Sequence, residues 1–263
     1  MKVSLEGKTI LITGASSGIG EATARSCVKK GMHCVVTARR KDRLHSLADE
    51  LGEQCTYIVG DVTEPGFNQY LLDEAGDVYA LFANAGHGLD QAMIEYNQEN
   101  VKQLFELNFF SAVELASLVA KQMTQKKSGH IIFCTSCLSK FATPQHGAYC
   151  ASKSALEAVA KSMRMELRDL KKRNTVFVST VHPIGTKTEF FDESAKRSGI
   201  ANSDFASQTP SWLMQSPDKV ASAVVRCLQK PKPEVWTSVP MRLASTTFCA
   251  FPRIASALLN RVS

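Results

Sequence analysis

Residues 13–20 read TGASSGIG, and a regular pattern flanks them on each side. A short β-branched and apolar run, 8–13, leads into them, and a helical pattern from Glu21 to Lys30, closed by Gly31, follows. A strand, a glycine-rich turn and a helix in this order form the first βα unit of a dinucleotide-binding fold, whose helix N-terminus presents free N–H groups to a pyrophosphate. The spacing G-x-x-x-G-x-G would also suit a simple tight turn, but the flanking strand and helix favour nucleotide binding.

Strand and helix patterns alternate along the rest of the chain. Six more runs have the length and composition of strands in a parallel sheet: 33–37, 55–60, 78–83, 131–135, 174–181 and 234–238. Helical patterns separate most of them, and no repeat or interdomain linker interrupts the order. This alternation predicts an α/β fold with a doubly wound, mostly parallel sheet (a Rossmann fold) in a single domain that spans residues 1–263.

The composition is ordinary for a globular protein, since 44% of the 263 residues are hydrophobic and 21% are charged. The net charge of +6 is spread along the chain, which disfavours nucleic-acid binding. Apart from Cys134 and Cys137, the eight cysteines lack the paired spacing of metal ligands, so we expect no metal site and a reducing compartment. No signal-peptide pattern opens the sequence and no stretch approaches about 18 apolar residues, which together predict a cytoplasmic protein.

Two arginines follow the second strand. In the general fold an acid about 20 residues past the glycines binds the adenosine ribose 2′-hydroxyl, whereas arginine accommodates a 2′-phosphate. Arg39 and Arg40 come before the first acid, Asp42. Because a guanidinium suits phosphate geometry, the sequence favours NADP(H) over NAD(H). The alternative is that both arginines begin the next helix with their charges in water.

Three further short motifs, each with a polar residue, lie at the ends of apolar segments or within them and are candidate cofactor or structural contacts. Asp61 and Val62 follow the third strand, where Asp61 would either meet adenine or cap the next turn. The small residues at 84–86, Asn-Ala-Gly, let a cofactor approach the backbone. Asn108 lies in a largely apolar helical pattern, about 98–121, and is either a structural hydrogen-bonding kink or part of a polar relay.

The sequence YCASK at 149–153 carries the candidate chemistry. Tyr149 and Lys153 are four residues apart in a helical pattern, so their side chains share one face. An ammonium beside a phenol lowers the tyrosine pKa, which would make Tyr149 a general acid and base. Ser136 ends the fifth strand thirteen residues earlier. Taken alone, the spacing would equally fit a surface helix with a solvated lysine.

The motifs together have an order that is more specific than any one of them. With TGASSGIG, Asp61-Val62, NAG at 84–86, Asn108, Ser136, YCASK and a proline after the sixth strand, the chain resembles the short-chain dehydrogenase/reductase family from Lys8 to about Ser238. Two positions depart from the family pattern: Ile184 replaces a glycine that many members have, and Ala83 replaces an asparagine.

The resemblance implies a set of cofactor contacts at the strand ends. They are Gly14, Ser16, Ser17, Gly18, Ile19 and Gly20 for the pyrophosphate and ribose, Arg39 and Arg40 for a 2′-phosphate, Asp61 and Val62 for adenine, Asn84, Ala85 and Gly86 behind the cofactor, and Tyr149, Lys153, Pro183, Ile184 and Thr188 near the nicotinamide.

The resemblance also implies catalytic roles. Tyr149 would be the acid or base and Ser136 would bind the substrate oxygen. Lys153 would hold the nicotinamide ribose and lower the tyrosine pKa, and Asn108 would anchor a water in a proton relay. The expected function is NADP(H)-dependent interconversion of a carbonyl compound and its secondary alcohol. The alternative is a non-catalytic NADP(H)-binding module that acts through a partner.

Two segments near the end of the chain have separate interpretations. The run 186–216 is too long for an ordinary connection and predicts a lid over an apolar substrate site. The tail 240–263 is apolar and basic, and we expect it to pack on its own protein rather than on a membrane surface or a second subunit. The small residues of the Tyr149 helix favour close packing, and with the resemblance they predict a homodimer or homotetramer.

Overall fold

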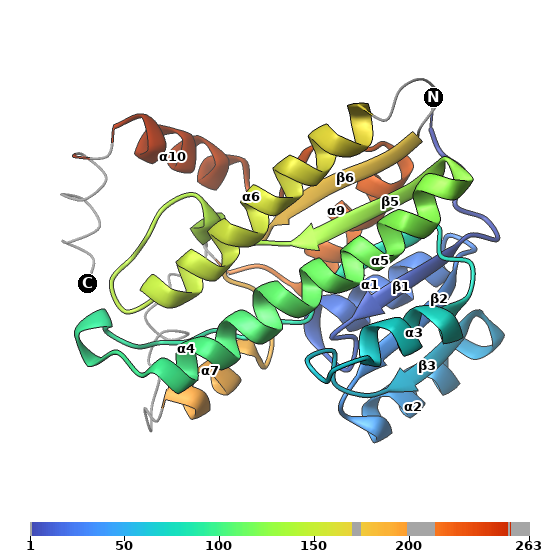
Figure 1. Cartoon of the computed structure of the whole chain (residues 1–263), viewed down its shortest axis with the longest axis horizontal. Helices are drawn as coiled ribbons and strands as arrows, with labels where there is room; N and C mark the ends of the chain where they lie inside the picture. Colours follow the sequence, from blue (N-terminus) through green and yellow to red (C-terminus); the bar gives the residue numbers. More distant parts are fainter. Residues whose placement is uncertain (1, 170–174, 199–213, 252, 254–263) are drawn as a thin grey trace.

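A computed structural model describes residues 2–169, 175–198, 214–251 and 253 (Figure 1). Seven strands form one sheet in the order β3-β2-β1-β4-β5-β6-β7, and every neighbouring pair is parallel. The strands are β1 (Thr9–Thr13), β2 (His33–Ala38), β3 (Cys55–Val59), β4 (Ala80–Ala83), β5 (Ser128–Cys134), β6 (Thr175–His182) and β7 (Glu234–Trp236). This order confirms the predicted doubly wound sheet, and β4 begins two residues later than the apolar run suggested.

Helices cover both faces of the sheet. On one face lie α1 (Gly18–Val28), α2 (Lys41–Leu51) and α9 (Pro217–Gln229), and on the other lie α3 (Phe67–Ala75), α5 (Ser111–Lys126) and α6 (Gly147–Asp169). In Figure 1, α4 (Gln98–Phe105), α7 (Phe190–Ser198) and α10 (Val239–Ala250) lie toward the carboxyl ends of the strands. Short helical turns are η1 (Gly52–Gln54), η2 (Met93–Glu95), η4 (Cys137–Ser139) and the π-helical turn η3 (Glu106–Phe110).

Two apolar clusters, one on each face, hold the layers together. Ile10 and Ile12 of β1 join the cluster under α1, α2 and α9, whereas Leu11 joins the cluster under α3, α5 and α6. Successive side chains of a strand point to opposite faces, so a strand that is covered on both sides is apolar throughout. This is why β1 appears in the sequence as a continuous apolar run without alternation.

The predicted helix 98–121 is an interrupted run. It consists of α4, the π-helical turn η3 and α5, and it ends at Lys126. By length and composition alone the run Gln98–Lys126 could cross a membrane. However, Leu115, Val119 and Met123 are buried in the core, and packing of this kind gives the central helix of a globular domain the same apolar composition.

Parts of the lid and of the tail are described. Helix α7 lies within the predicted lid 186–216, whose residues 199–213 fall outside the described residues. Helix α10 takes up the first half of the predicted tail 240–263 and packs on the chain itself: the rings of Phe248 and Phe141 are 5.2 Å apart, and the Cys249 thiol donates to the Lys140 carbonyl at 3.2 Å. Residues 252 and 254–263 fall outside the described part of the chain.

Candidate active site

The glycine-rich turn has the close packing that a nucleotide cradle requires. Gly14 has a positive φ of 65°, and a Cβ added at Gly20 would lie 2.5 Å from the Gly14 carbonyl oxygen. Asn84 donates from its side-chain amide to the carbonyl of Thr13 at 3.0 Å, which ties the end of β4 to the turn. Ser17 precedes α1 without a side-chain capping bond, so the first N–H groups of the helix stay available to an anion. The local structure therefore fits a dinucleotide pyrophosphate.

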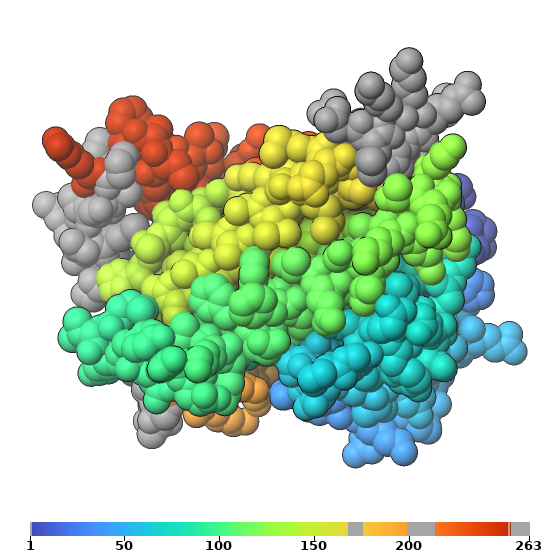
Figure 2. All heavy atoms as spheres, in the orientation of Figure 1, coloured from blue at the N-terminus to red at the C-terminus, as the bar shows by residue number. Residues whose placement is uncertain are grey.

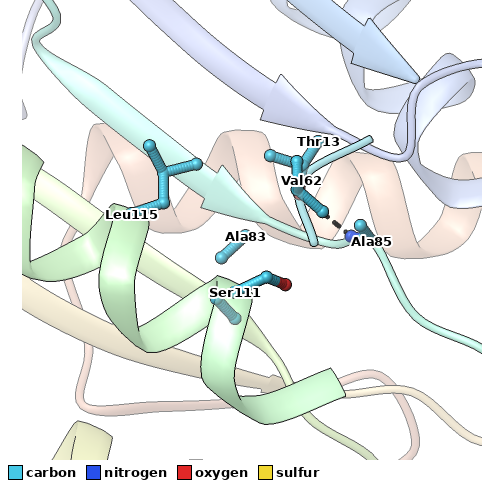
Figure 3. Close-up of a pocket in the computed structure, with 7 residues that line it drawn as sticks. Thr13, Val62, Ala83, Ala85, Ser111 and Leu115 are labelled. Carbon is cyan, nitrogen blue, oxygen red and sulfur yellow. Dashed lines mark hydrogen bonds between the residues drawn. The ribbon is translucent and has the colours of Figure 1, made fainter. Parts of the chain in front are cut away.

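A small gap, with no room for a water molecule, lies beside this turn, where the strand order reverses between β1 and β4 (Figure 3). Small and apolar side chains line it: Thr13, Val62, Ala83, Ala85, Ser111, Ala112 and Leu115. The Thr13 hydroxyl accepts hydrogen bonds from the backbone N–H groups of Asn84 and Ala85, both at 3.0 Å. In open parallel sheets ligands bind at this switch point. The sequence indicated Val62 and Ala85, but it contained no sign of the residues from α5, whose position depends on helix packing.

The two arginines after β2 have different partners. Arg40 donates to the hydroxyls of Ser16, at 3.0 and 3.1 Å, and Ser17, at 2.7 Å, and so lies over the glycine-rich turn. Its third partner is the Glu189 carboxylate at 2.6 Å. Arg39 instead faces a carboxylate oxygen of Asp61 at 3.6 Å. Arg40 does stand at the start of α2, with a side chain that is 43% exposed, but its charge is paired with Glu189 and is not free in water.

The two carboxylate oxygens of Asp61 have different partners. Oδ1 accepts from the backbone N–H of Thr63 at 3.0 Å and from its hydroxyl at 2.8 Å, which is the capping role that the sequence left open. Oδ2 faces Arg39. Contact with adenine stays a prediction for this residue.

The four candidate catalytic residues converge at the carboxyl ends of β4 and β5. Tyr149 and Lys153 are one turn apart on α6 and are 8% and 4% exposed, with the lysine Nζ 6.0 Å from the centre of the tyrosine ring. Ser136 follows β5, and its hydroxyl lowers the pKa of Tyr149 through a hydrogen bond. Asn108 Oδ1 and Lys153 Nζ flank Gly86, at 2.9 and 3.3 Å from the point a Cβ there would occupy.

Burial controls the protonation state of this group. It raises the pKa of Tyr149 well above its ordinary value, and the hydrogen bond with Ser136 offsets only part of that effect. Burial also lowers the pKa of Lys153, whose ammonium donates to the Cys134 carbonyl at 2.9 Å. In the protein by itself burial therefore outweighs any lowering of the tyrosine pKa by Lys153, which stays a prediction. Tyr149 is a neutral phenol that holds a proton to donate.

Asn108 owes its position to the π-helical turn η3. Its Oδ1 accepts from the backbone N–H of His87 at 2.9 Å, and its Nδ2 donates to the His87 carbonyl at 3.0 Å and to the Ser152 hydroxyl at 3.2 Å. The amide is therefore a structural tie between three elements, which is the first of the two alternatives that the sequence left open. The water relay implied by the resemblance stays a prediction.

The segment after β6 closes over the site from another side. The methyl group of Thr188 lies 2.8 Å from where a Cβ of Gly18 would be, so this residue rests on the glycine-rich turn. Pro183 accepts from the backbone N–H of Cys137 at 2.9 Å, and Ile184 is buried where many family members have glycine. The ring of Phe190 contacts Tyr149 edge-on, with centroids 5.7 Å apart. A side chain of the predicted lid thus covers the candidate catalytic tyrosine.

A buried ionic network lies behind the site. Glu157 on α6 is 3% exposed and accepts hydrogen bonds from Lys140, from Lys161 at 2.7 Å and from the Ser139 hydroxyl at 2.5 Å. Lys140 also pairs with Glu234 at 3.0 Å. Sequence reasoning missed this network, because its members are far apart in the chain and no local pattern connects them.

Replacement of Glu157 by glutamine should reduce the acid sensitivity of the fold. The cationic and hydroxyl partners lower the pKa of Glu157 from 4.5 to about 2, so its stabilisation is complete above 4.5 and is lost as the pH falls through about 2. The difference corresponds to about 3 kcal/mol at neutral pH. Urea unfolding of Glu157→Gln should show lower stability at pH 7 and a smaller loss between pH 5 and 2. Equal losses in both proteins would contradict this account, and exposed Glu166→Gln on the same helix is the control.

The structure combines a parallel sheet, a nucleotide-binding turn at the point where the strand order reverses, and a Ser-Tyr-Lys group beside that turn. This combination is typical of a nicotinamide-dependent oxidoreductase. Residues 8–199 match the profile of the family described as short chain dehydrogenase. Dehydrogenase/reductase SDR family protein 7-like of Drosophila melanogaster is 30% identical over 245 residues, which cover 89% of this chain and 73% of that protein. The chain belongs to the short-chain dehydrogenase/reductase family and is an NAD(P)-dependent oxidoreductase.

Solved structures agree on the fold. A short-chain dehydrogenase/reductase from Burkholderia phymatum in complex with NAD has a TM-score of 0.83 at 22% identity, with 93% of each chain covered. The closed form of a serine dehydrogenase complexed with NADP+ has a TM-score of 0.79 at 24% identity, with 87% of this chain and 93% of that chain covered. These similar folds bind either nucleotide, so the fold by itself does not select between NAD and NADP.

Proposed function

We propose that the protein uses NADPH to reduce an apolar aldehyde or ketone to its alcohol, with Tyr149 as the proton donor. The observation that carries the proposal is the buried, protonated Tyr149 beside Ser136, at the carboxyl edge of the sheet next to a glycine-rich turn. NADPH oxidation measured against a panel of apolar aldehydes and ketones tests it. Turnover of none of them, with NADPH or with NADH, would contradict it.

The site residues divide the work of the reduction. When bound, the nicotinamide supplies hydride to the carbonyl carbon. Ser136 and Tyr149 donate hydrogen bonds to the carbonyl oxygen, and these bonds strengthen as negative charge develops there. Tyr149 then releases its proton to the oxygen. The buried ammonium of Lys153 stabilises the phenolate that remains, because an opposite charge favours the ionised form.

The apolar substrate class rests on the surroundings of Tyr149. Leu89, Leu104 and Ala148 are buried against it, and Phe190 covers its ring. A site with these walls buries hydrocarbon favourably and leaves an additional charged group of a substrate without a partner.

The preference for NADP(H) rests on Arg40. Its guanidinium already bonds the two hydroxyls of the glycine-rich turn, so it lies where it can form paired hydrogen bonds with a 2′-phosphate. Without a bound nucleotide, the Arg40 guanidinium forms an ion pair with the Glu189 carboxylate. No acid that could accept a ribose 2′-hydroxyl precedes Arg40 on the way out of β2, the segment 33–38.

Loss of Arg40 should abolish the preference for NADPH over NADH. Charge-assisted bonds to a phosphate are worth about 1.5–3 kcal/mol, so Arg40→Ala should weaken NADPH binding roughly 10- to 100-fold. NADH lacks the phosphate and should bind with nearly unchanged affinity. Arg39→Ala is the matched comparison, since Arg39 faces Asp61 instead. Titration by nucleotide fluorescence measures all four affinities, and an equal loss for NADPH and NADH would contradict the assignment.

Assembly into a homodimer or homotetramer is part of the proposal. Figure 2 shows α5 and α6 side by side across one face of the molecule. Phe110, just before α5, and Met165 on α6 are more than half exposed, and Ala151, Ser154 and Ala158 are small exposed residues on α6. Such a surface suits a second copy better than water. Light scattering of the purified protein tests the assembly.

A further inference from the structure

His182, the last residue of β6, lies directly behind Ser136. Its Nδ1 is 3.2 Å from the Ser136 carbonyl oxygen and 3.2 Å from the Thr135 hydroxyl. The imidazole is completely buried and stacks on Trp236, with ring centroids 4.5 Å apart and an angle of 13° between the planes. Neither the resemblance nor the mechanism above gives this residue a role.

The hydrogen bonds define which imidazole nitrogen carries the hydrogen. A carbonyl oxygen only accepts, and the Thr135 hydroxyl already donates to the Val181 carbonyl at 2.8 Å. Nδ1 therefore donates to the Ser136 carbonyl, and Nε2 lies 3.0 Å from the Thr180 hydroxyl, which is also 3.4 Å from the Pro233 carbonyl. Burial lowers the pKa of His182, which keeps the ring neutral in this tautomer.

The neighbouring carboxylates do not turn His182 into a metal ligand. Nitrogen and oxygen atoms of Glu157, His182 and Glu234 lie within 4.8 Å of one another. However, the Lys140 ammonium bonds both carboxylates, and Lys161 bonds Glu157 as well. Two ammonium groups balance the two carboxylates, so the cluster already contains its cations.

The same cluster secures the far side of the turn that carries Ser136. The Ser136 hydroxyl accepts from the backbone N–H of Leu138 at 3.1 Å, and the Ser139 hydroxyl lies 2.8 Å from the Ser136 carbonyl and 2.5 Å from Glu157. The turn is thus held by α6 through Glu157 and by β6 through His182. The Ser136 carbonyl also accepts from the backbone N–H of Ser139 at 3.1 Å, and His182 adds a bond to this carbonyl from outside the turn.

We propose that His182 is a positioning residue: its Nδ1–H fixes the Ser136 carbonyl and thereby aims the Ser136 hydroxyl at Tyr149 and at the substrate oxygen. This inference rests on the proposed function. A displaced Ser136 hydroxyl would misplace the substrate carbonyl, and errors of about 1 Å in such placement cost up to about 100-fold in rate. It would also weaken the hydrogen bond that lowers the pKa of Tyr149.

The other titratable groups nearby are the same in all the variants compared below, including His146, whose pKa, despite burial, is raised by its hydrogen bond to Asp90. Burial raises the pKa of the thiols that face Tyr149, which are Cys134, Cys137 and Cys150. Around His182, ion pairing lowers the pKa of Glu157 and Glu234 and raises that of Lys140. Lys153, the cation next to Tyr149, has its pKa lowered by burial and is common to all variants compared below. A difference between variants in the pH profile therefore reports on Tyr149.

The test uses the full-length protein in the oxidation direction, where Tyr149 acts as base. Initial rates are measured from pH 6 to 10 with NADP+ and the secondary alcohol that the wild-type protein oxidises fastest. His182→Leu should lower kcat roughly 10- to 100-fold, leave the KM for NADP+ almost unchanged and move the rise of kcat/KM, which reports on Tyr149 with the cationic NADP+ bound beside it, to higher pH. His182→Asn, whose amide N–H replaces the Nδ1–H, should recover most of the rate and the original profile.

His130→Leu is the control for loss of a buried imidazole. His130 is equally buried, bonds Ser179 at 2.8 Å and lies near the opposite end of β5, so this variant should lose stability without a change in the pH profile. An unshifted profile for His182→Leu, or an equal defect in His182→Asn, would overturn the inference. Failure of the proposed function is recognised separately, because Tyr149→Phe would then turn over like the wild-type protein.

Discussion

Tyr149→Phe should lose nearly all turnover and retain the nucleotide. A positioned general acid contributes roughly 10² to 10⁴ in rate, and phenylalanine keeps the ring while it removes the phenolic proton that would pass to the substrate oxygen. The fold should tolerate the change, since the ring packs among Leu89, Ala148 and Phe190. The measurement is NADPH oxidation with a carbonyl compound that the wild-type protein reduces, together with a titration of NADPH.

The matched control for this prediction is Tyr79→Phe. Tyr79 is a partly buried tyrosine whose pKa is also raised by burial, but it precedes β4, at the amino end of the sheet. Its replacement should leave the rate unchanged. If Tyr149→Phe keeps wild-type kcat, Tyr149 is not the proton donor, and the chemistry must be assigned to another group.

Lys153→Met should abolish most turnover and, at the same time, make the protein more stable. The ammonium is 4% exposed, and burial lowers its pKa, which means that the fold disfavours the charge. A methionine of similar length removes this cost, with an expected gain of about 1 kcal/mol in the free energy of unfolding. The rate should fall because the phenolate of Tyr149 loses the cation beside it. Thermal unfolding and NADPH oxidation of the same preparation measure both effects.

An exposed lysine is the control for the combined loss of turnover and gain in stability expected of Lys153→Met. Lys121→Met on α5 removes a charge that water already solvates, so neither rate nor stability should change appreciably. A Lys153→Met protein that is less stable than wild type would show that the buried ammonium contributes to the fold, and a fully active one would remove Lys153 from the mechanism.

The fold and the convergence of the candidate residues could be predicted because they depend on local patterns. Strands buried on both faces have continuous apolar sequences, and the carboxyl ends of parallel strands meet at one edge. Ser136 and Gly86 follow such strands, so the strand pattern alone brings them to the same edge of the sheet. The four-residue spacing of Tyr149 and Lys153 likewise places both side chains on one helix face.

The remaining features depend on packing between distant segments. The sequence indicated that Lys153 lies near Tyr149, but not that burial would outweigh it and raise the pKa of the phenol. The π-helical turn around Asn108 and the cover of Tyr149 by Phe190 have no local signature. The same holds for His182, because a histidine at the end of a strand becomes informative only when Ser136 is found against it.

Calorimetric titration of the wild-type protein with NADPH and with NADH tests the nucleotide assignment without any knowledge of the substrate. NADPH should bind at least about tenfold more tightly than NADH, because the paired bonds of Arg40 to the 2′-phosphate are available only to that nucleotide. Equal binding of both, or tighter binding of NADH, would contradict the assignment of Arg40 and with it the proposed NADPH-dependent reduction.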